Sequence, residues 1–181
     1  KTATAVWKTQ YYLTLTTSPS VGATLTGEGW YDSGASASIS TDNIVPIDSG
    51  SRYRFNGWTT DNMDEIADAS STSTTVTMDS AKTVTANYMM QYYLTVTSPH
   101  GTTGGEGWYD NGATANATVT PLTVSGPTGV QYVFTNWSVD ATGTTSPSDP
   151  ITMNAPKTAT AVWKTQYYLT LTTSPSVGAT L

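Results

Sequence analysis

Alternation of large apolar residues with threonine is the dominant pattern along this chain. Tyr11–Thr17 reads Tyr-Tyr-Leu-Thr-Leu-Thr-Thr, and the same pattern returns over Tyr92–Thr97. A period of two places every other side chain on one face of a strand, and Thr, Val and Tyr suit that pleated surface. Further strands are predicted at residues 35–40, 53–58, 74–78, 82–88, 113–120 and 132–137. Almost nothing has the pattern of a helix.

The pattern itself repeats. Residues 1–25 return without a change as residues 157–181, an offset of 156 positions (157 − 1). Within that period the pentapeptide QYYLT opens at Gln10, Gln91 and Gln166, which are 81 (91 − 10) and 75 (166 − 91) positions apart. Two unequal modules, A and B, therefore alternate.

This division gives four segments. They are the last strand of a preceding module B (residues 1–9), module A (10–90), module B (91–165) and the first strand of a following module A (166–181). The junctions at Tyr88–Gln91 and Trp163–Gln166 contain no Gly or Pro, so we expect little bending between modules.

Turn residues separate the predicted strands. Ser18-Pro19 and Ser98-Pro99 end the first strand of each module, because proline donates no ladder hydrogen bond. Asp32-Ser33-Gly34 and Asp110-Asn111-Gly112 are turns of the kind that join antiparallel strands. The predicted fold class is all-β, with two tandem modules of about five or six short strands, each an antiparallel sheet or small sandwich.

Composition narrows the possible partners. Only seven residues are basic and the net charge is -6, which argues against nucleic acid, since phosphate binding needs clustered Lys and Arg. No apolar run approaches the roughly 20 residues of a membrane-spanning helix. Cysteine is absent, so neither disulfides nor thiolate metal sites stabilise the modules. The 6 Trp, 11 Tyr and 2 Phe residues are the expected core.

Catalytic chemistry finds little support. His100 is the only histidine and lies in a Ser-Pro-His-Gly turn. The sequence contains no recognisable pairing of a nucleophile with an oriented base. Glu28 with Asp32, and Glu106 with Asp110, resemble paired carboxylates. Their recurrence in both modules favours a structural role in the turn. We therefore expect no enzyme activity and no cofactor.

Three kinds of binding or modification site remain as hypotheses. The segment 61–68 contains four carboxylates that offer oxygen ligands to Ca²⁺, namely Asp61, Asp64, Glu65 and Asp68. A solvated loop with a short helix capped at Asp61 is the favoured interpretation of this segment. Asn116-Ala117-Thr118 and Asn136-Trp137-Ser138 are glycosylation sequons, with Asn116 favoured. The aromatic pairs Trp30-Tyr31 and Trp108-Tyr109 present rings for stacking on sugars if they are exposed.

Lys82 and Lys157 occupy matching positions beside a predicted hairpin turn. Such a place predicts that both face solvent, which argues against the internal Lys–Asn isopeptide bond of some surface adhesins.

Four motifs recur in order in both modules. They are QYYLT, GEGWYD (27–32 and 105–110), Y-x-F-x-x-W (53–58 and 132–137) and T-M-x-x-x-K-T-x-T-A (77–86 and 152–161). Together they resemble the divergent B-repeat named after a Listeria internalin, found in bacterial and archaeal surface proteins. Module A departs from that pattern by an insertion, Asp61–Ser73. The resemblance implies an extracellular, surface-attached or filament-forming protein, and it carries no catalytic residues.

A structural repeat of a long stalk, filament or adhesin is therefore the leading hypothesis. Its partners are then neighbouring repeats, along one chain or between subunits by strand exchange at the exposed first and last strands. The alternative is a carbohydrate- or surface-binding adhesin repeat.

Overall fold

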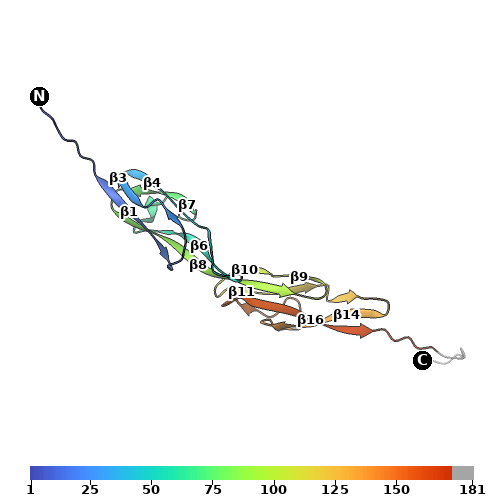
Figure 1. The fold of residues 1–181 in the computed structure, drawn as a ribbon. Coiled ribbons are helices and arrows are strands. Elements are labelled where there is room, and N and C mark those ends of the chain that lie inside the picture. The colour runs from blue at the N-terminus through green and yellow to red at the C-terminus, as the bar shows by residue number, and fades with distance from the viewer. Residues whose placement is uncertain (173–181) are drawn as a thin grey trace. The chain divides into compact units, whose positions relative to one another are not determined.

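The computed structural model describes residues 1–172 and contains two compact units, Lys1–Gln91 and Tyr92–Leu181 (Figure 1). Unit 1 contains module A and unit 2 contains module B, and the units meet one residue after the predicted boundary. Nearly all regular structure is strand, which confirms the all-β class. Over residues 1–172 the one helical element is a single 3-10 turn, η1 (Met63–Glu65).

Unit 1 is a sandwich of two sheets. The larger sheet has the order β3-β1-β8-β6-β5, from β3 (Gly29–Asp32), β1 (Gln10–Ser18), the first part of β8 (Lys82–Thr97), β6 (Ser51–Thr59) and β5 (Ile44–Pro46). The smaller sheet has the order β2-β4-β7, from β2 (Leu25–Thr26), β4 (Ala35–Thr41) and β7 (Ser73–Met78).

The core of unit 1 lies between these sheets. Leu13 of β1 and Val84 of β8 face Ile39 of β4 and Val76 of β7, and all four are buried in one cluster. Alternate residues of each strand reach this core, as the period of two predicted. Trp58 of β6 completes the cluster. Its indole N–H donates to the carbonyl of Ser71 at 2.9 Å.

Unit 2 repeats this plan with more interruptions. Its main sheet has the order β10-β8-β16-β14-β13, from β10 (Gly107–Asp110), the second part of β8, β16 (Lys157–Tyr167), β14 (Val130–Val139) and β13 (Thr123–Ser125). Two small pairs complete it: β11 (Thr114–Ala115) with β15 (Ile151–Thr152), and β12 (Thr118–Thr120) with β9 (Thr102–Gly104).

The single strand predicted at residues 113–120 is thus divided into β11 and β12. Ser148, from a distant loop, takes the place of a strand partner at the break. Its backbone N–H donates to the carbonyl of Ala117 at 2.8 Å, and its hydroxyl accepts from the N–H of Ala117 at 3.0 Å.

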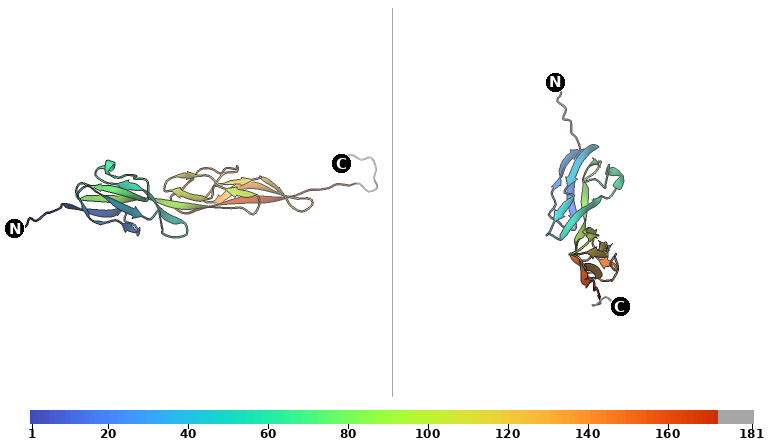
Figure 2. Two further views of the ribbon diagram at one scale, coloured as in Figure 1. Left: turned by 90° about the horizontal axis from the view of Figure 1, so that it is seen from above. Right: turned by 90° about the vertical axis from the view of Figure 1, so that its right-hand side faces the viewer.

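Parallel pairing between the first and last strand of a module is the main departure from the predicted antiparallel sheet. β1 runs parallel to β8 with Leu13 opposite Lys82, and β8 runs parallel to β16 with Leu94 opposite Lys157 (Figure 2). Because the first and the last strand of a module run in the same direction, they pair in parallel where they lie side by side.

The turns predicted to join neighbouring antiparallel strands change sheet instead, so those predictions are wrong. Asp32-Ser33-Gly34 leads from β3 in one sheet to β4 in the other, and Asp110-Asn111-Gly112 leads from β10 to β11 in the same way. The predicted hairpin turn beside Lys82, Asp79-Ser80-Ala81, likewise leads from β7 to β8. These turns connect the two layers of the sandwich rather than neighbouring strands of one sheet.

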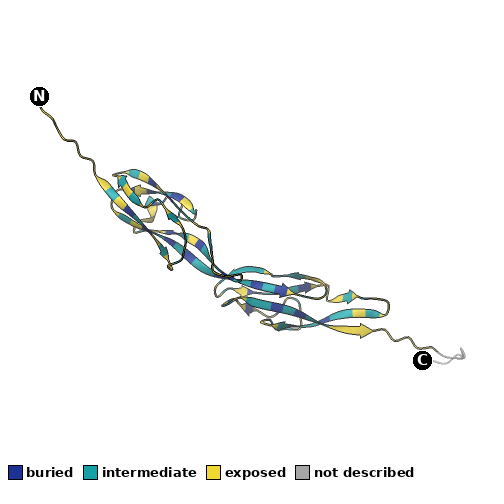
Figure 3. Cartoon of the chain, viewed as in Figure 1, coloured by how far each residue is buried: buried dark blue, intermediate teal, exposed yellow. Residues whose placement is uncertain are grey.

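The flanking segments are also described in part. Residues 1–9, predicted as a last strand, form no strand and are exposed along their length (Figure 3). In the segment 166–181, predicted as a first strand, Gln166 and Tyr167 still belong to β16, residues 168–172 form no strand, and residues 173–181 lie outside the described residues.

Candidate functional site

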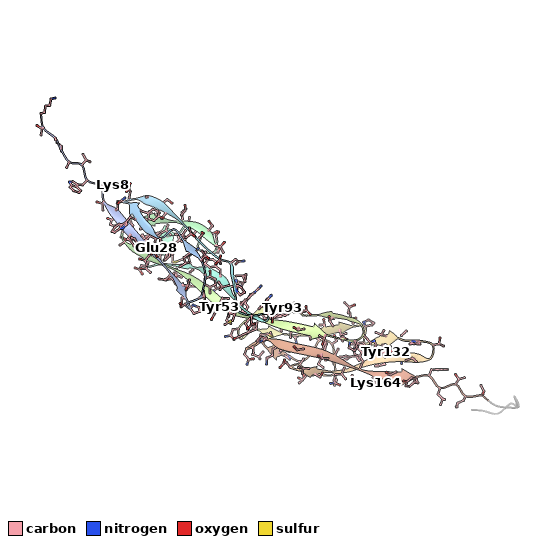
Figure 4. All side chains as sticks on the ribbon, in the orientation of Figure 1. Lys8, Glu28, Tyr53, Tyr93, Tyr132 and Lys164 are labelled. Carbon is pink, nitrogen blue, oxygen red and sulfur yellow. The ribbon has the colours of Figure 1, made fainter. Side chains whose placement is uncertain are left out.

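The GEGWYD segment is a candidate site that is present in both units. The Glu28 carboxylate accepts the backbone N–H of Leu15 at 3.1 Å and the hydroxyl of Tyr12 at 3.1 Å (Figure 4). The hydrogen bond to Glu28 and its negative charge raise the pKa of Tyr12 above its ordinary value. Glu28 therefore ties its own turn to strand β1.

Unit 2 makes the same contacts. Glu106 accepts the N–H of Val96 at 3.4 Å and the hydroxyl of Tyr93 at 2.9 Å, and the hydrogen bond to Glu106 raises the pKa of Tyr93. Both carboxylates therefore hold a strand and a tyrosine of their own module in place.

The first glycine of GEGWYD is required by its backbone. Gly27 has a φ of 111°, and a Cβ there would lie 2.2 Å from the carbonyl oxygen of Ser38. Gly105 has a φ of 87°, and its Cβ would lie 2.1 Å from the carbonyl oxygen of Asn116. No L-residue with a side chain fits such an approach.

Asp32, the last residue of the motif, binds Lys8, which precedes β1, and Gln10, the first residue of β1. Lys8 Nζ lies 2.9 Å from one carboxylate oxygen and 2.8 Å from the other, and Gln10 Nε2 donates at 2.7 Å. These bonds, from Lys8 first and then from Gln10, lower the pKa of the Asp32 carboxyl.

The aromatic pairs divide by face. Tyr31 and Tyr109 are partly buried against the cores, and their hydroxyls donate to the carbonyls of Gly27 and Gly105 at 2.8 Å, so sugar stacking on these two rings stays a prediction. Trp30 keeps 66% of its surface exposed, with Tyr12 edge-on at 5.3 Å. Trp108 is half-buried, 5.2 Å from Tyr93.

The four calcium candidates are engaged elsewhere or stand apart. Glu65 forms an ion pair with Lys82, and Asp68 accepts from the N–H and the hydroxyl of Ser70 at 2.9 and 2.6 Å. Asp64 lies in η1, and Asp61 is exposed before it. Over residues 1–172 no three His, Asp or Glu side chains gather as a metal site would need.

The predicted cap of this segment is displaced by one residue. Asn62, not Asp61, caps η1, because its side chain accepts from the N–H of Asp64.

Lys82 was predicted to face solvent, and the structure shows that its side chain is buried instead. Its side chain is 7% exposed and contacts Glu65 of the module A insertion and Asp79 at 2.5 Å. Burial acts to lower the pKa of Lys82, but the hydrogen bonds to Asp79 and Glu65 prevail and raise it. Its counterpart Lys157 lies 3.6 Å from Asp140 and is less buried.

Both sequon asparagines take part in local hydrogen bonds. The amide of Asn116 donates to the carbonyl of Ser148 at 2.8 Å, and that of Asn136 donates to the carbonyl of Trp137 at 2.8 Å. Both asparagines are half-buried: Asn116 lies between β11 and β12, and Asn136 lies within β14 at an irregular register. The preference for Asn116 stays a prediction.

His100 belongs to an aromatic cluster of unit 2. Its ring stacks on Tyr132 with centroids 3.8 Å apart and meets Trp163 edge-on at 5.5 Å. The indole of Trp163 donates to the hydroxyl of Ser98 at 2.9 Å. The histidine therefore lies in the predicted turn and packs against side chains of β14 and β16.

Sequence reasoning missed the glutamine that opens each first strand. Gln10 donates to Asp32 at 2.7 Å, whereas Gln91 accepts from Arg52 at 2.9 Å and Gln166 accepts from Gln131 at 2.7 Å. The signal was present, since all three copies of QYYLT begin with it.

Comparison with known proteins identifies the modules. The chain matches no curated protein and no solved structure. The family model described as the divergent InlB B-repeat domain matches residues 13–91 and 92–166, almost the whole of the two units. The chain therefore belongs to the divergent InlB B-repeat family and carries two of its domains in tandem.

Proposed function

We propose that this chain is a structural, non-catalytic repeat region of a cell-surface protein, in which A and B modules extend a stalk or filament. The family is associated with bacterial surface proteins. One observation carries the proposal: β8 (Lys82–Thr97) is at once the last strand of unit 1 and the first strand of unit 2. Modules joined without a linker add length with each repeat.

The chemistry of the motifs supports this proposal. Glu28 and Glu106, the carboxylates most suggestive of acid–base work, accept backbone and tyrosine hydrogen bonds of their own modules. No helix among the described residues is long and apolar enough to span a bilayer.

Small-angle scattering from chains of one, two and four periods tests the proposal. For a stalk, the radius of gyration rises in near proportion to the number of periods. A rise with about the 0.38 power of chain length, as for compact globules, would exclude it.

Separate subunits joined by strand exchange are a variant of the same function. Residues 1–9 have the sequence of part of β16, and residues 166–172 that of part of β1. Each exposed segment therefore has a defined place in a second copy. Concentration-dependent oligomers of the 181-residue chain, absent for residues 10–165, support the variant. A monomer at all concentrations argues for one continuous chain.

A carbohydrate-binding repeat is the second candidate, and the exposed ring of Trp30 favours it. Its free face suits stacking on a pyranose, and Tyr12 holds it edge-on. Binding to immobilised glycans that Trp30→Ala abolishes and Trp7→Ala leaves intact supports this function. Equal binding by both variants excludes it.

Glycan attachment to Asn116 is proposed as a modification of the exported protein. Intact mass of the protein from its native source, with and without Asn116→Gln, tests it. Loss of glycan mass from that variant but not from Asn136→Gln is the expected result.

A further inference from the structure

The two ends of this chain show the two halves of one junction. Gln166–Thr172 has the sequence of Gln10–Thr16, so the surroundings of both segments describe one strand at its passage from module B into module A. Unit 2 shows the module that this strand leaves, and unit 1 shows the module that it enters.

The glutamine at this point uses a different atom in each half. In unit 2, Gln131 Nε2 donates to Gln166 Oε1 at 2.7 Å. In unit 1, Gln10 Nε2 donates to Asp32 at 2.7 Å. Because one carboxamide accepts through oxygen and donates through nitrogen, both bonds are compatible in one side chain.

The two partners also approach from opposite edges of the strand. In unit 1 the carbonyl of Thr9 accepts from Ser33 N–H at 2.9 Å, on the edge facing β3. In unit 2 the N–H of Tyr168, the counterpart of Tyr12, donates to Gly129 at 2.8 Å, on the edge facing β14. Positions 9 and 12 are three apart, and backbone groups of successive residues alternate between edges. The strand therefore has room for β14 and β3 at once.

A cavity of about 600 Å³ lies at this end of unit 2, where the strand meets the start of β14. It is lined by Gly129, Val130, Gln131, Gln166, Tyr167 and Tyr168. In unit 1 the counterparts of the last three residues pair with β3: Gln10 with Asp32, Tyr11 with Tyr31 and Tyr12 with Trp30. Tyr168, which is exposed in unit 2, is the counterpart of Tyr12, whose ring packs edge-on against Trp30 in unit 1.

We propose that residues 166–168, which pair with β14 of module B along one edge, pair along the other edge with the β3 segment (Gly29–Asp32) of a following module A, and that Gln166 fixes the junction. Gln166 accepts from Gln131 behind it and donates to the next Asp32 ahead of it. Lys164, the counterpart of Lys8, neutralises the same carboxylate. This inference rests on the proposed function, because it needs a second module A after module B.

An A-B-A chain tests the proposal. It consists of the 181 residues followed by a second copy of residues 26–91, which completes another module A. Since the sequence lacks cysteine, Asn154→Cys in module B and Ser49→Cys in the second copy give one unique label pair. Electron-electron resonance then measures the distribution of distances across the junction.

We expect a narrow distribution that Gln166→Ala broadens about two-fold, as for domains without a fixed interface. Gln166→Glu broadens it as well, because a carboxylate accepts from Gln131 but no longer donates to Asp32. Gln10→Ala is the matched control. It lies in the same sequence context without a module before it, and we expect no change.

An unchanged width in both Gln166 variants would overturn the inference, as would a wild-type distribution as broad as theirs. Failure of the proposed function has another signature, since the radius of gyration then does not grow in proportion to the number of periods. Urea unfolding of each variant shows that the modules themselves stay folded.

Discussion

Residues 1–9 and 157–165 have the same sequence and different structures. The second segment lies in β16 between β14 and β8, where Ala159 and Ala161 are buried. The first forms no strand, and its Trp7 is 90% exposed. Intrinsic strand propensity is identical in both places, so the difference comes from the partners alone. A strand of this repeat is specified by the module that receives it.

The same contrast holds for the strand that opens a module. Leu13 of β1 is 0% exposed, whereas its counterpart Leu169 is 76% exposed. Paired edges and a facing sheet convert one sequence from an exposed segment into part of a core. Identical substitutions at paired positions therefore isolate the contribution of the partners.

The largest effect is expected from a charge in β16. Ala161→Asp places a carboxylate in the core of unit 2 and should lower its free energy of unfolding by about 3 kcal/mol or more. Ala5→Asp, the same change in the exposed copy, should stay within about 0.5 kcal/mol. Urea unfolding followed by circular dichroism measures both, and equal losses would contradict the comparison.

Truncation of a core leucine should come next. Leu13→Ala removes a fully buried side chain of unit 1, a change that costs about 2–5 kcal/mol depending on how the cavity relaxes. Leu169→Ala should cost less than about 0.5 kcal/mol. Denaturant midpoints of the two variants give the answer. A matching loss in Leu169→Ala would mean that the second copy is also packed.

Tryptophan quenching gives a smaller, optical difference. Trp7 is exposed, whereas Trp163 is half-buried and donates to Ser98. Trp7→Phe should therefore remove emission that acrylamide quenches readily, and Trp163→Phe should remove emission that is shielded. The comparison is contradicted if the two variants show the same Stern–Volmer slope.

The smallest expected effect concerns Asp32. Lys8 lowers the pKa of this carboxyl, so the stabilisation is present above its unfolded value of 3.8 and is lost as the pH falls through the lower folded pKa. Lys8→Ala should raise the pKa of Asp32, and Lys164→Ala should leave it unchanged. Titration of the carboxyl carbon by NMR resolves the shift. An unchanged value in Lys8→Ala would show that this contact does not act on the carboxyl in solution.

Local patterns were sufficient for much of the fold. Alternation placed β1 and β4, the repeated QYYLT placed the module boundary within one residue, and the four motifs pointed to the family. Each of these features depends on residues that are close together in the sequence. The relative direction of two paired strands does not depend on such residues, so the parallel pairing of β1 with β8 was found only in the structure.

The candidate site was less accessible to sequence reasoning because its partners are distant. The turn containing Glu28 was recognised, but the N–H of Leu15 that it binds is 13 positions away. Burial of Lys82 depends on Glu65 from an insertion that only module A possesses. No local pattern encodes such a meeting of separate segments.

Hydrogen exchange of the identical segments tests the central claim most directly. Residues 91–156 are added before Lys1, so that residues 1–9 complete a module B, and Trp7→Phe distinguishes the two copies by mass. Without the addition, residues 158–164 should be protected and residues 2–8 should exchange freely. With it, residues 2–8 should gain the protection of residues 158–164. Free exchange of residues 2–8 in both chains would contradict the claim that each module specifies the strand it receives.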